Sequence, residues 1–226
     1  LMLVHVSADR RRVTVVSLPR DSYTRLPAHT HPATGRRHPG GPQKLNAALA
    51  HGGPRLTVRA VEAMTHVHVD HYVEVDFAGF VRAVDALGGV AVCAPRPLHD
   101  SHSGLHLPAG TSTLDGERAL RYVRARSVDG QGDLGRMRRQ QRLVASLLAR
   151  ATSSGVLLNP VRLNAFVSTL LHAVRTDPGF GQQEMVELGR TLHALTPRDV
   201  EFRSVPVADP GYPVPGLGET VLWDQP

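Results

Sequence analysis

Short segments rich in β-branched residues alternate with longer amphipathic segments along the whole chain of 226 residues. Residues 1–6 and 13–19 are joined by a turn-like Ser-Ala-Asp-Arg sequence, which predicts a β-hairpin. Further strands are expected over 68–76, 90–93, 200–207 and 219–223, and helices over 44–51, 54–64, 77–87, 115–122, 133–151, 160–174 and 182–195. Such alternation is typical of the α/β class. We therefore predict one domain over residues 1–226, with a mixed central β-sheet flanked by helices on both faces.

Local signals mark several helix boundaries. Asp76 and Asp115 stand directly before helical patterns, where an aspartate can cap the free N–H groups of the first turn. Gly52-Gly53 is typical of a helix end, and Pro54 suits the first position of the next helix. We therefore expect two separate helices on either side of this glycine pair.

Residues 21–43 and 95–113 contain so much Pro, Gly or His that long loops are expected there, with a third loop over 209–218. Long loops within a compact domain are more often functional or mobile than structural. His29, His31 and His38 lie in the first of these segments. Their irregular spacing does not favour a metal site.

The composition narrows the classes of protein. The chain has 26 Lys and Arg against 20 Asp and Glu, a net charge of +6, which indicates a nucleic acid, a membrane surface or a phosphorylated substrate as partner. Cys93 is the single cysteine, so an internal disulfide and a cysteine-based zinc cluster are excluded. No apolar run is long enough to span a bilayer.

Two arginines follow a tyrosine at alternate positions, Tyr122, Arg124 and Arg126. In an extended chain these three side chains lie on one side, with the guanidinium groups about 7 Å apart. Two such cations repel each other unless an anion lies between them, and a pyrophosphate suits two bidentate arginines. The alternative is a pair of solvated arginines.

The helix expected from residue 133 carries polar groups on its apolar face. At about 100° per residue, Asp133, Arg136 and Gln140 fall within an arc of about 60°. The same broad stripe contains Met137, Leu143, Val144, Leu147 and Leu148, and the solvated side is expected to contain Arg138, Arg139, Arg142 and Arg150. Polar groups on a buried face need partners or line a cavity, so an ion pair between Asp133 and Arg136 is the alternative to a ligand site.

Two more cations are candidates for an anion site. Arg20 follows the second expected strand, and ligands in α/β proteins commonly bind at strand ends. Lys44, the only lysine, begins the helix after the first long loop. Taken alone, Arg20 is as readily an ordinary turn residue.

Six segments, in this order, resemble the LytR-CpsA-Psr family. They are Ser-Leu-Pro-Arg-Asp (17–21), Lys-Leu-Asn-Ala-Ala (44–48), Asp-His-Tyr-Val-Glu-Val-Asp-Phe-Ala-Gly-Phe (70–80), Asp-Ala-Leu-Gly-Gly-Val (85–90), Leu-Asp-Gly-Glu-Arg-Ala-Leu-Arg-Tyr-Val-Arg-Ala-Arg (114–126) and Asp-Leu-Gly-Arg-Met-Arg-Arg-Gln-Gln (133–141). The resemblance is dense over residues 1–150 and looser beyond. Six motifs in order are far more specific than any single motif.

The resemblance implies a membrane-anchored, extracytoplasmic phosphotransferase that moves a glycopolymer from a polyprenyl-pyrophosphate carrier onto peptidoglycan, usually with Mg²⁺. It implies that the pyrophosphate is held by Arg20, Arg124, Arg126 and Arg136, with Lys44 and Gln140 near the same group. Asp133 matches the acid that activates the acceptor hydroxyl, and Arg136 acts with it in catalysis. The lipid tail is implied to lie in an apolar cavity between sheet and helices.

The metal and the membrane anchor are expected outside the printed sequence. The family's magnesium ligands include aspartates just upstream of the segment matching residues 1–6, so the chain is expected to be a fragment. Asp21 is a possible carboxylate ligand within it.

Two alternatives remain open. One is a module that binds polyprenyl phosphate or pyrophosphate without turnover, because the upstream metal ligands are missing. The other is a DNA-binding transcriptional regulator, although the sequence shows no helix-turn-helix or zinc-finger pattern. The transferase interpretation expects no nucleic-acid partner.

Overall fold

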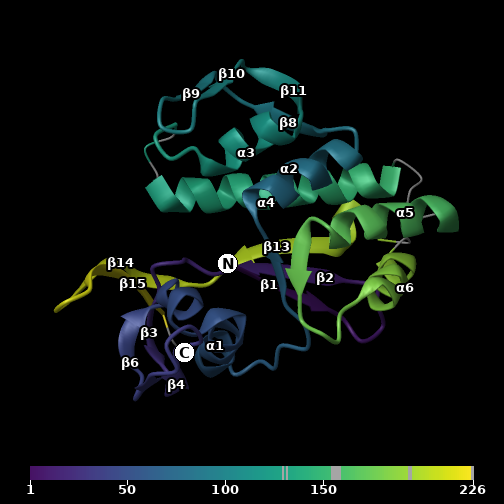
Figure 1. The fold of residues 1–226 in the computed structure, drawn as a ribbon. Coiled ribbons are helices and arrows are strands. Elements are labelled where there is room, and N and C mark those ends of the chain that lie inside the picture. Colours follow the sequence, from purple (N-terminus) through teal and green to yellow (C-terminus); the bar gives the residue numbers. More distant parts are fainter. Residues whose placement is uncertain (129, 131, 154–158, 193–194, 225–226) are drawn as a thin grey trace. The chain divides into compact units, whose positions relative to one another are not determined.

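The computed structural model describes residues 1–128, 130, 132–153, 159–192 and 195–224, with the backbone alone at 132–134, 153 and 197. These residues form a mixed α/β protein in which helices are interspersed among short strands (Figure 1). The chain divides into two compact units, described here one at a time. The first comprises residues 1–3, 16–72 and 203–226, and the second comprises 4–15 and 73–202. No helix in the described ranges is both long and apolar enough to cross a bilayer.

The expected N-terminal hairpin is confirmed. Strands β1 (Met2–Val6) and β2 (Val13–Ser17) are neighbours in a three-stranded sheet that also contains β13 (Val200–Ser204). The turn is closed by the N–H of Ser7, which donates to the carbonyl of Arg12 at 2.9 Å. The other described strands pair in twos. A single central sheet with helices on both faces, and a single domain, therefore stay predictions.

In the first unit, the loop expected over 21–43 is wrong. Strand β3 (Tyr23–Leu26) pairs antiparallel with β6 (Gly41–Lys44), and β4 (His29–Thr30) pairs with β5 (Arg37–His38). The loop expected over 209–218 is also wrong. There β14 (Val207–Val214) pairs with β15 (Gly218–Trp223). Proline and glycine are compatible with short two-stranded ribbons, which leave one edge of each strand unpaired.

The two expected helices of the first unit form one kinked element, α1 (Ala47–Thr65). Gly53 has φ 67°, a left-handed conformation that breaks the helical path and that glycine adopts without steric cost. Leu45, Ala48 and Leu56 are buried beneath α1, in a core that also includes Leu18 and Leu26. Figure 1 shows β3, β4 and β6 beside this helix.

The second unit contains most of the helices. Its elements are β7 (Val73–Val75), α2 (Phe77–Ala86), β8 (Val90–Ala94), β9 (Leu98–Asp100), β10 (Leu105–Leu107), β11 (Gly110–Leu114), α3 (Gly116–Arg124), α4 (Gly132–Ser153), α5 (Pro160–Leu171), β12 (Val174–Thr176), α6 (Gln182–Leu192) and a 3-10 helix (Pro197–Asp199). The strand expected over 68–76 is thus confined to β7. The loop expected over 95–113 is wrong, because β9 pairs with β10 and β11 with β8.

The predicted caps of α2 and α3 are confirmed. The carboxylate of Asp76 accepts the N–H of Gly79 at 2.6 Å, and that of Asp115 accepts the N–H of Arg118 at 2.8 Å. The main core of this unit packs β8 and β11 against α3 and α4. Tyr122 is buried in it, with 1% of its surface exposed.

Candidate functional sites in the two units

The turn after β2 fixes the backbone of Arg20. Ser22 donates its hydroxyl to the carbonyl of Pro19 at 2.6 Å and accepts the indole N–H of Trp223 at 2.8 Å. The carbonyl of Arg20 accepts the N–H of Asn46 at 2.9 Å. The turn is therefore held by main-chain and side-chain bonds, while the Arg20 side chain is 47% exposed.

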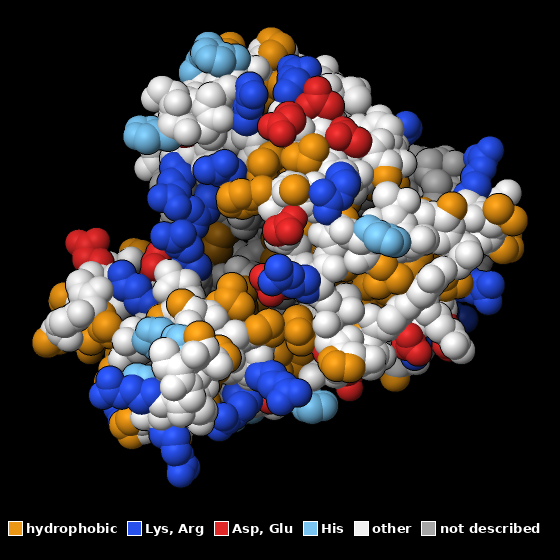
Figure 2. Space-filling view, viewed as in Figure 1, with side chains coloured by type: hydrophobic (Ala, Val, Ile, Leu, Met, Phe, Trp, Pro, Cys, Tyr) orange, Lys and Arg blue, Asp and Glu red, His pale blue; other side chains and the backbone are white. Residues whose placement is uncertain are grey.

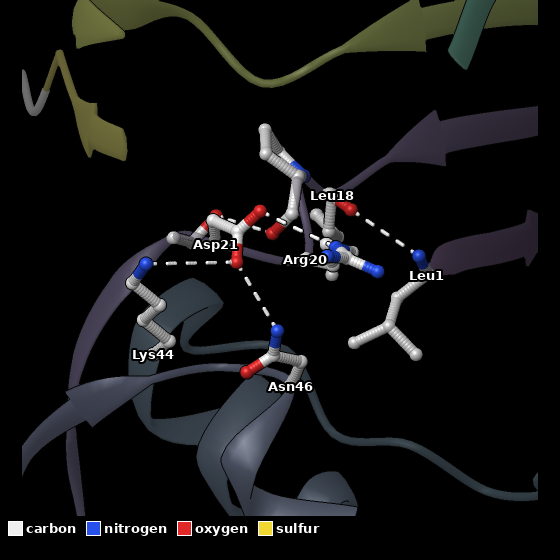
Figure 3. Close-up of polar contacts among 8 residues, drawn as sticks. Leu1, Leu18, Arg20, Asp21, Lys44 and Asn46 are labelled. Carbon is white, nitrogen blue, oxygen red and sulfur yellow. Dashed lines mark hydrogen bonds and ion pairs between the residues drawn. The ribbon is translucent and has the colours of Figure 1, made fainter. Parts of the chain in front are cut away.

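Asp21 brings the two candidate cations of the first unit together (Figure 3). Its carboxylate lies 3.3 Å from Nε of Arg20 and 4.0 Å from Nζ of Lys44, and it accepts the side-chain amide of Asn46 at 3.1 Å. These groups are half-exposed, so each ion pair contributes about 1 kcal/mol or less. Asn46 was missed from the sequence, although it lies in the segment 44–48.

The described residues do not fit a Mg²⁺ site. Among them, no group of three or more His, Cys, Asp or Glu side chains could hold a metal ion. Asp21 already has cationic and amide partners, which compete with a metal for its oxygens. The histidines of residues 21–43 instead stack: the ring of His29 lies 5.2 Å from that of His38 and 6.0 Å from that of His51.

In the second unit, the expected extended conformation of residues 122–126 is wrong. Helix α3 continues through Arg124, so Tyr122 turns into the core while Arg124 is exposed. The three side chains therefore do not share one side. The N–H of Ala125 completes the last helical bond, to Arg121, and the backbone leaves the helix at Ala125.

The guanidinium group of Arg124 stacks on an exposed aromatic ring. Its central carbon lies 4.8 Å from the ring centroid of Phe77, the first residue of α2. Phe77 is 61% exposed. A cation–π contact at such a site contributes about 0.5–1 kcal/mol and restricts the arginine to one direction. Phe77 was not singled out from the sequence.

A buried carboxylate fixes the segment that follows α3. Asp100, at the end of β9, is 3% exposed and accepts the backbone N–H groups of Arg126 at 2.6 Å and Ser127 at 2.9 Å. Burial raises the pKa of Asp100, but the backbone N–H groups that donate to it together lower the pKa more, to well below the ordinary value. A lone aspartate between expected loops gave no sequence signal.

Helix α4 carries the remaining predicted residues. Arg136 and Gln140, one turn apart, are both half-buried. Asp133 lies in the first turn of α4, but its side chain is outside the described residues. Its predicted role and its pairing with Arg136 therefore stay predictions.

The expected solvated side of α4 is only partly correct. Arg138 and Arg142 are exposed, but Arg139 is 3% exposed and donates from Nη2 to the carbonyl of Ala125. Arg150 donates from Nε to the carbonyl of Leu87 at 3.0 Å. Both arginines satisfy helix-end carbonyls of neighbouring elements. Of the predicted apolar stripe, Met137 and Leu143 are buried and Leu148 is 37% exposed.

The candidate cations therefore form two sets. Arg20 and Lys44 meet at Asp21 in the first unit, and Arg124, Arg126 and Arg136 belong to the second. Figure 2 shows Lys and Arg side chains gathered where α4 begins. Convergence of all of them on one ligand stays a prediction.

Comparison with known proteins identifies the family. The profile described as "LytR_cpsA_psr family" matches residues 1–218. The chain belongs to the LytR_cpsA_psr family. It is 34% identical over 212 residues to the probable cell wall biosynthesis protein LcpB of Corynebacterium glutamicum, an alignment that covers 94% of this chain and 47% of LcpB. It is 32% identical over 178 residues to a polyisoprenyl-teichoic acid–peptidoglycan teichoic acid transferase, TagU, of Halalkalibacterium halodurans, covering 78% of this chain and 54% of TagU.

A solved structure of the same family has the same fold. The crystal structure of TagV from Bacillus subtilis superposes with a TM-score of 0.79 at 26% identity, over 99% of this chain and 82% of TagV. The chain spans about half the length of the curated relatives named above. Within this LytR_cpsA_psr chain, all six motifs that indicated the family lie in the matched region.

Proposed function

We propose that this LytR_cpsA_psr chain is the catalytic part of a transferase that moves a teichoic-acid-type glycopolymer from a polyprenyl-pyrophosphate carrier onto peptidoglycan. The family membership supports this proposal, as does the TagU relative, whose name states such a transfer. The observation that carries it is the retention of arginines at the family's pyrophosphate-binding positions, on structural elements that fix their backbones. One domain with a central sheet between two helical layers is part of the proposal.

The arginines supply the grip on the pyrophosphate. In the proposal Arg20, Arg124, Arg126 and Arg136 bind its oxygens, and Lys44 and Gln140 lie near the same group. Each charge-assisted hydrogen bond contributes about 1.5–3 kcal/mol. Phosphoryl transfer needs mostly positioning and stabilisation of charge on the transferred oxygens, which guanidinium groups provide.

The reaction breaks one phosphorus–oxygen bond and forms another. A peptidoglycan hydroxyl attacks the phosphorus nearest the glycopolymer, the bond to the bridging oxygen breaks, and polyprenyl phosphate leaves. We assign acceptance of the hydroxyl proton to Asp133, at the start of α4, and stabilisation of the developing charge to Arg136. A neighbouring Arg136 keeps this carboxylate ionised but makes it a weaker base.

The metal, the membrane and the location also belong to the proposal. Mg²⁺ is expected from the family resemblance, with ligands upstream of Leu1, and no step is assigned to it because the described carboxylates do not fit such a site. We place the enzyme outside the cytoplasm at the cell membrane, where both the lipid carrier and peptidoglycan are within reach.

The test is transfer of a labelled glycopolymer from its polyprenyl-pyrophosphate carrier to purified peptidoglycan. The proposal expects label in peptidoglycan and release of polyprenyl phosphate in equal amounts. Arg136→Ala is expected to lower the rate at least tenfold, and Arg142→Ala, an exposed position on the same helix, serves as the control.

Two outcomes would contradict the proposal. Binding of the carrier without cleavage of its pyrophosphate, with Mg²⁺ present, would indicate the binding module. Salt-sensitive binding of DNA without binding of the carrier would indicate the regulator.

A further inference from the structure

The carboxylate of Asp100 joins two loops that are distant in sequence. One oxygen, Oδ2, accepts the N–H groups of Arg126 and Ser127, and the other, Oδ1, accepts the N–H of Ser103 at 2.9 Å. All three donors are backbone groups, so the bonds fix main-chain positions. Few surface loops have a buried charge as their anchor, because burying a carboxylate is costly unless it is fully hydrogen-bonded.

The same segment is also held by α4. The carbonyl of Ala125 accepts Nη2 of Arg139, and both residues are buried. Residues 125–127 are thus bonded through two N–H groups to Asp100 and through one carbonyl to Arg139. These bonds replace the helical bonds that are lost where α3 ends at Arg124.

We propose that Asp100 is a positioning residue for the pyrophosphate site, which fixes the backbone at Arg126 so that its guanidinium group starts from one defined point. This inference rests on the proposed function, because it takes Arg126 to contact the ligand. An arginine side chain has four rotatable bonds, and a mobile backbone would add to the freedom lost on binding. Asp100 itself does not contact the ligand.

Hydrogen exchange tests the structural half of the inference. In the intact protein, the amides of Arg126 and Ser127 are expected to be protected, and Asp100→Ala is expected to raise their exchange rates at least tenfold. Asp100→Asn keeps one acceptor oxygen, so it is expected to fold and to give a smaller increase. Unchanged exchange at these two amides in both variants would overturn the inference.

Binding of farnesyl pyrophosphate, measured by calorimetry, tests the functional half. Asp100→Ala is expected to weaken binding at least tenfold, and Asp100→Asn to weaken it less. Because Asp100 acts through Arg126, adding Asp100→Ala to Arg126→Ala should weaken binding no further than Arg126→Ala alone. Full additivity of the two changes, or wild-type affinity in Asp100→Ala despite fast exchange, would overturn the inference.

Asp115→Ala is the matched control. It removes the carboxylate that caps the opposite end of α3, so it should lower the melting temperature without changing affinity. A loss of affinity in this variant equal to that of Asp100→Ala would show general destabilisation and overturn the inference. Wild-type affinity in Arg126→Ala would instead overturn the proposed ligand contact of Arg126, whatever the exchange rates show.

Discussion

Replacement of Arg139 by methionine tests the most unexpected feature of α4. Arg138 and Arg139 are adjacent, and the helical periodicity predicts both on the solvated side. In the structure Arg138 is exposed, while Arg139 is 3% exposed and bonded to the carbonyl of Ala125. Arg139→Met keeps most of the unbranched side chain and removes the guanidinium group. Arg138→Met makes the same chemical change one position away.

The expected loss follows from the bond to Ala125. A hydrogen bond from a charged donor contributes about 1.5–3 kcal/mol, and a buried carbonyl left without a donor costs about 1–3 kcal/mol. Relief from burying a charge offsets part of this loss. We expect Arg139→Met to lower the free energy of unfolding by about 2–3 kcal/mol. The Arg138→Met change should stay within about 0.5 kcal/mol, as for most surface substitutions.

Thermal and urea unfolding, followed by circular dichroism, measure the difference. For a chain of this size 1 kcal/mol corresponds to about 2–4 °C, so Arg139→Met should lower the melting temperature by about 4–12 °C. Its urea midpoint should fall while the slope stays the same. Equal melting temperatures for the two variants would refute the burial of Arg139 and its bond to residue 125.

Three further predictions concern the second unit. Arg124→Ala should weaken binding of an isoprenyl pyrophosphate at least tenfold, about 1.4 kcal/mol, with a nearly unchanged melting temperature; calorimetry and thermal unfolding check this, and ready unfolding with intact affinity would show a structural role. Phe77→Leu should weaken the same binding about two- to fivefold through loss of the cation–π contact, whereas Phe77→Tyr should restore it. The pKa of Asp100 is lowered in the folded protein, so its contribution to stability is complete above the unfolded pKa of about 4 and is lost as the pH falls through the folded pKa. Acid titration of the unfolding free energy should therefore be less steep below about pH 4 in Asp100→Asn, and equal slopes would contradict the assigned bonds.

The features that could be predicted from sequence are those with local causes. Asp76 and Asp115 cap their helices because a short side chain reaches N–H groups two or three residues ahead, an arrangement visible in the sequence itself. The N-terminal hairpin is set in the same way by two β-rich runs and a turn. Arg20 and Lys44 could be named as candidates, but their meeting at Asp21 depends on the pairing of β3 with β6.

The features that were missed depend on contacts between distant residues. Residues 122–126 fit both a helix and a strand by pattern, and burial of Tyr122 in the core selects the helix. A single apolar stripe describes a helix packed on one side, but α4 contacts both α3 and β8, so a second side is buried and includes Arg139. Asp100 has no sequence signal, because its donors lie 3, 26 and 27 residues away.

The two aspartates beside the arginines have different consequences for an anionic ligand. Asp21 contacts the side chains of Arg20 and Lys44, so a phosphate that binds these cations competes with a carboxylate already in place. Asp100 accepts the backbone N–H of Arg126, which leaves its charge engaged by the main chain. The first arrangement lowers the gain from each new ion pair, and the second reduces the conformational freedom that binding removes. Affinity for a pyrophosphate should therefore depend more steeply on the second unit's arginines than on Arg20, although all of them are cations of equal charge.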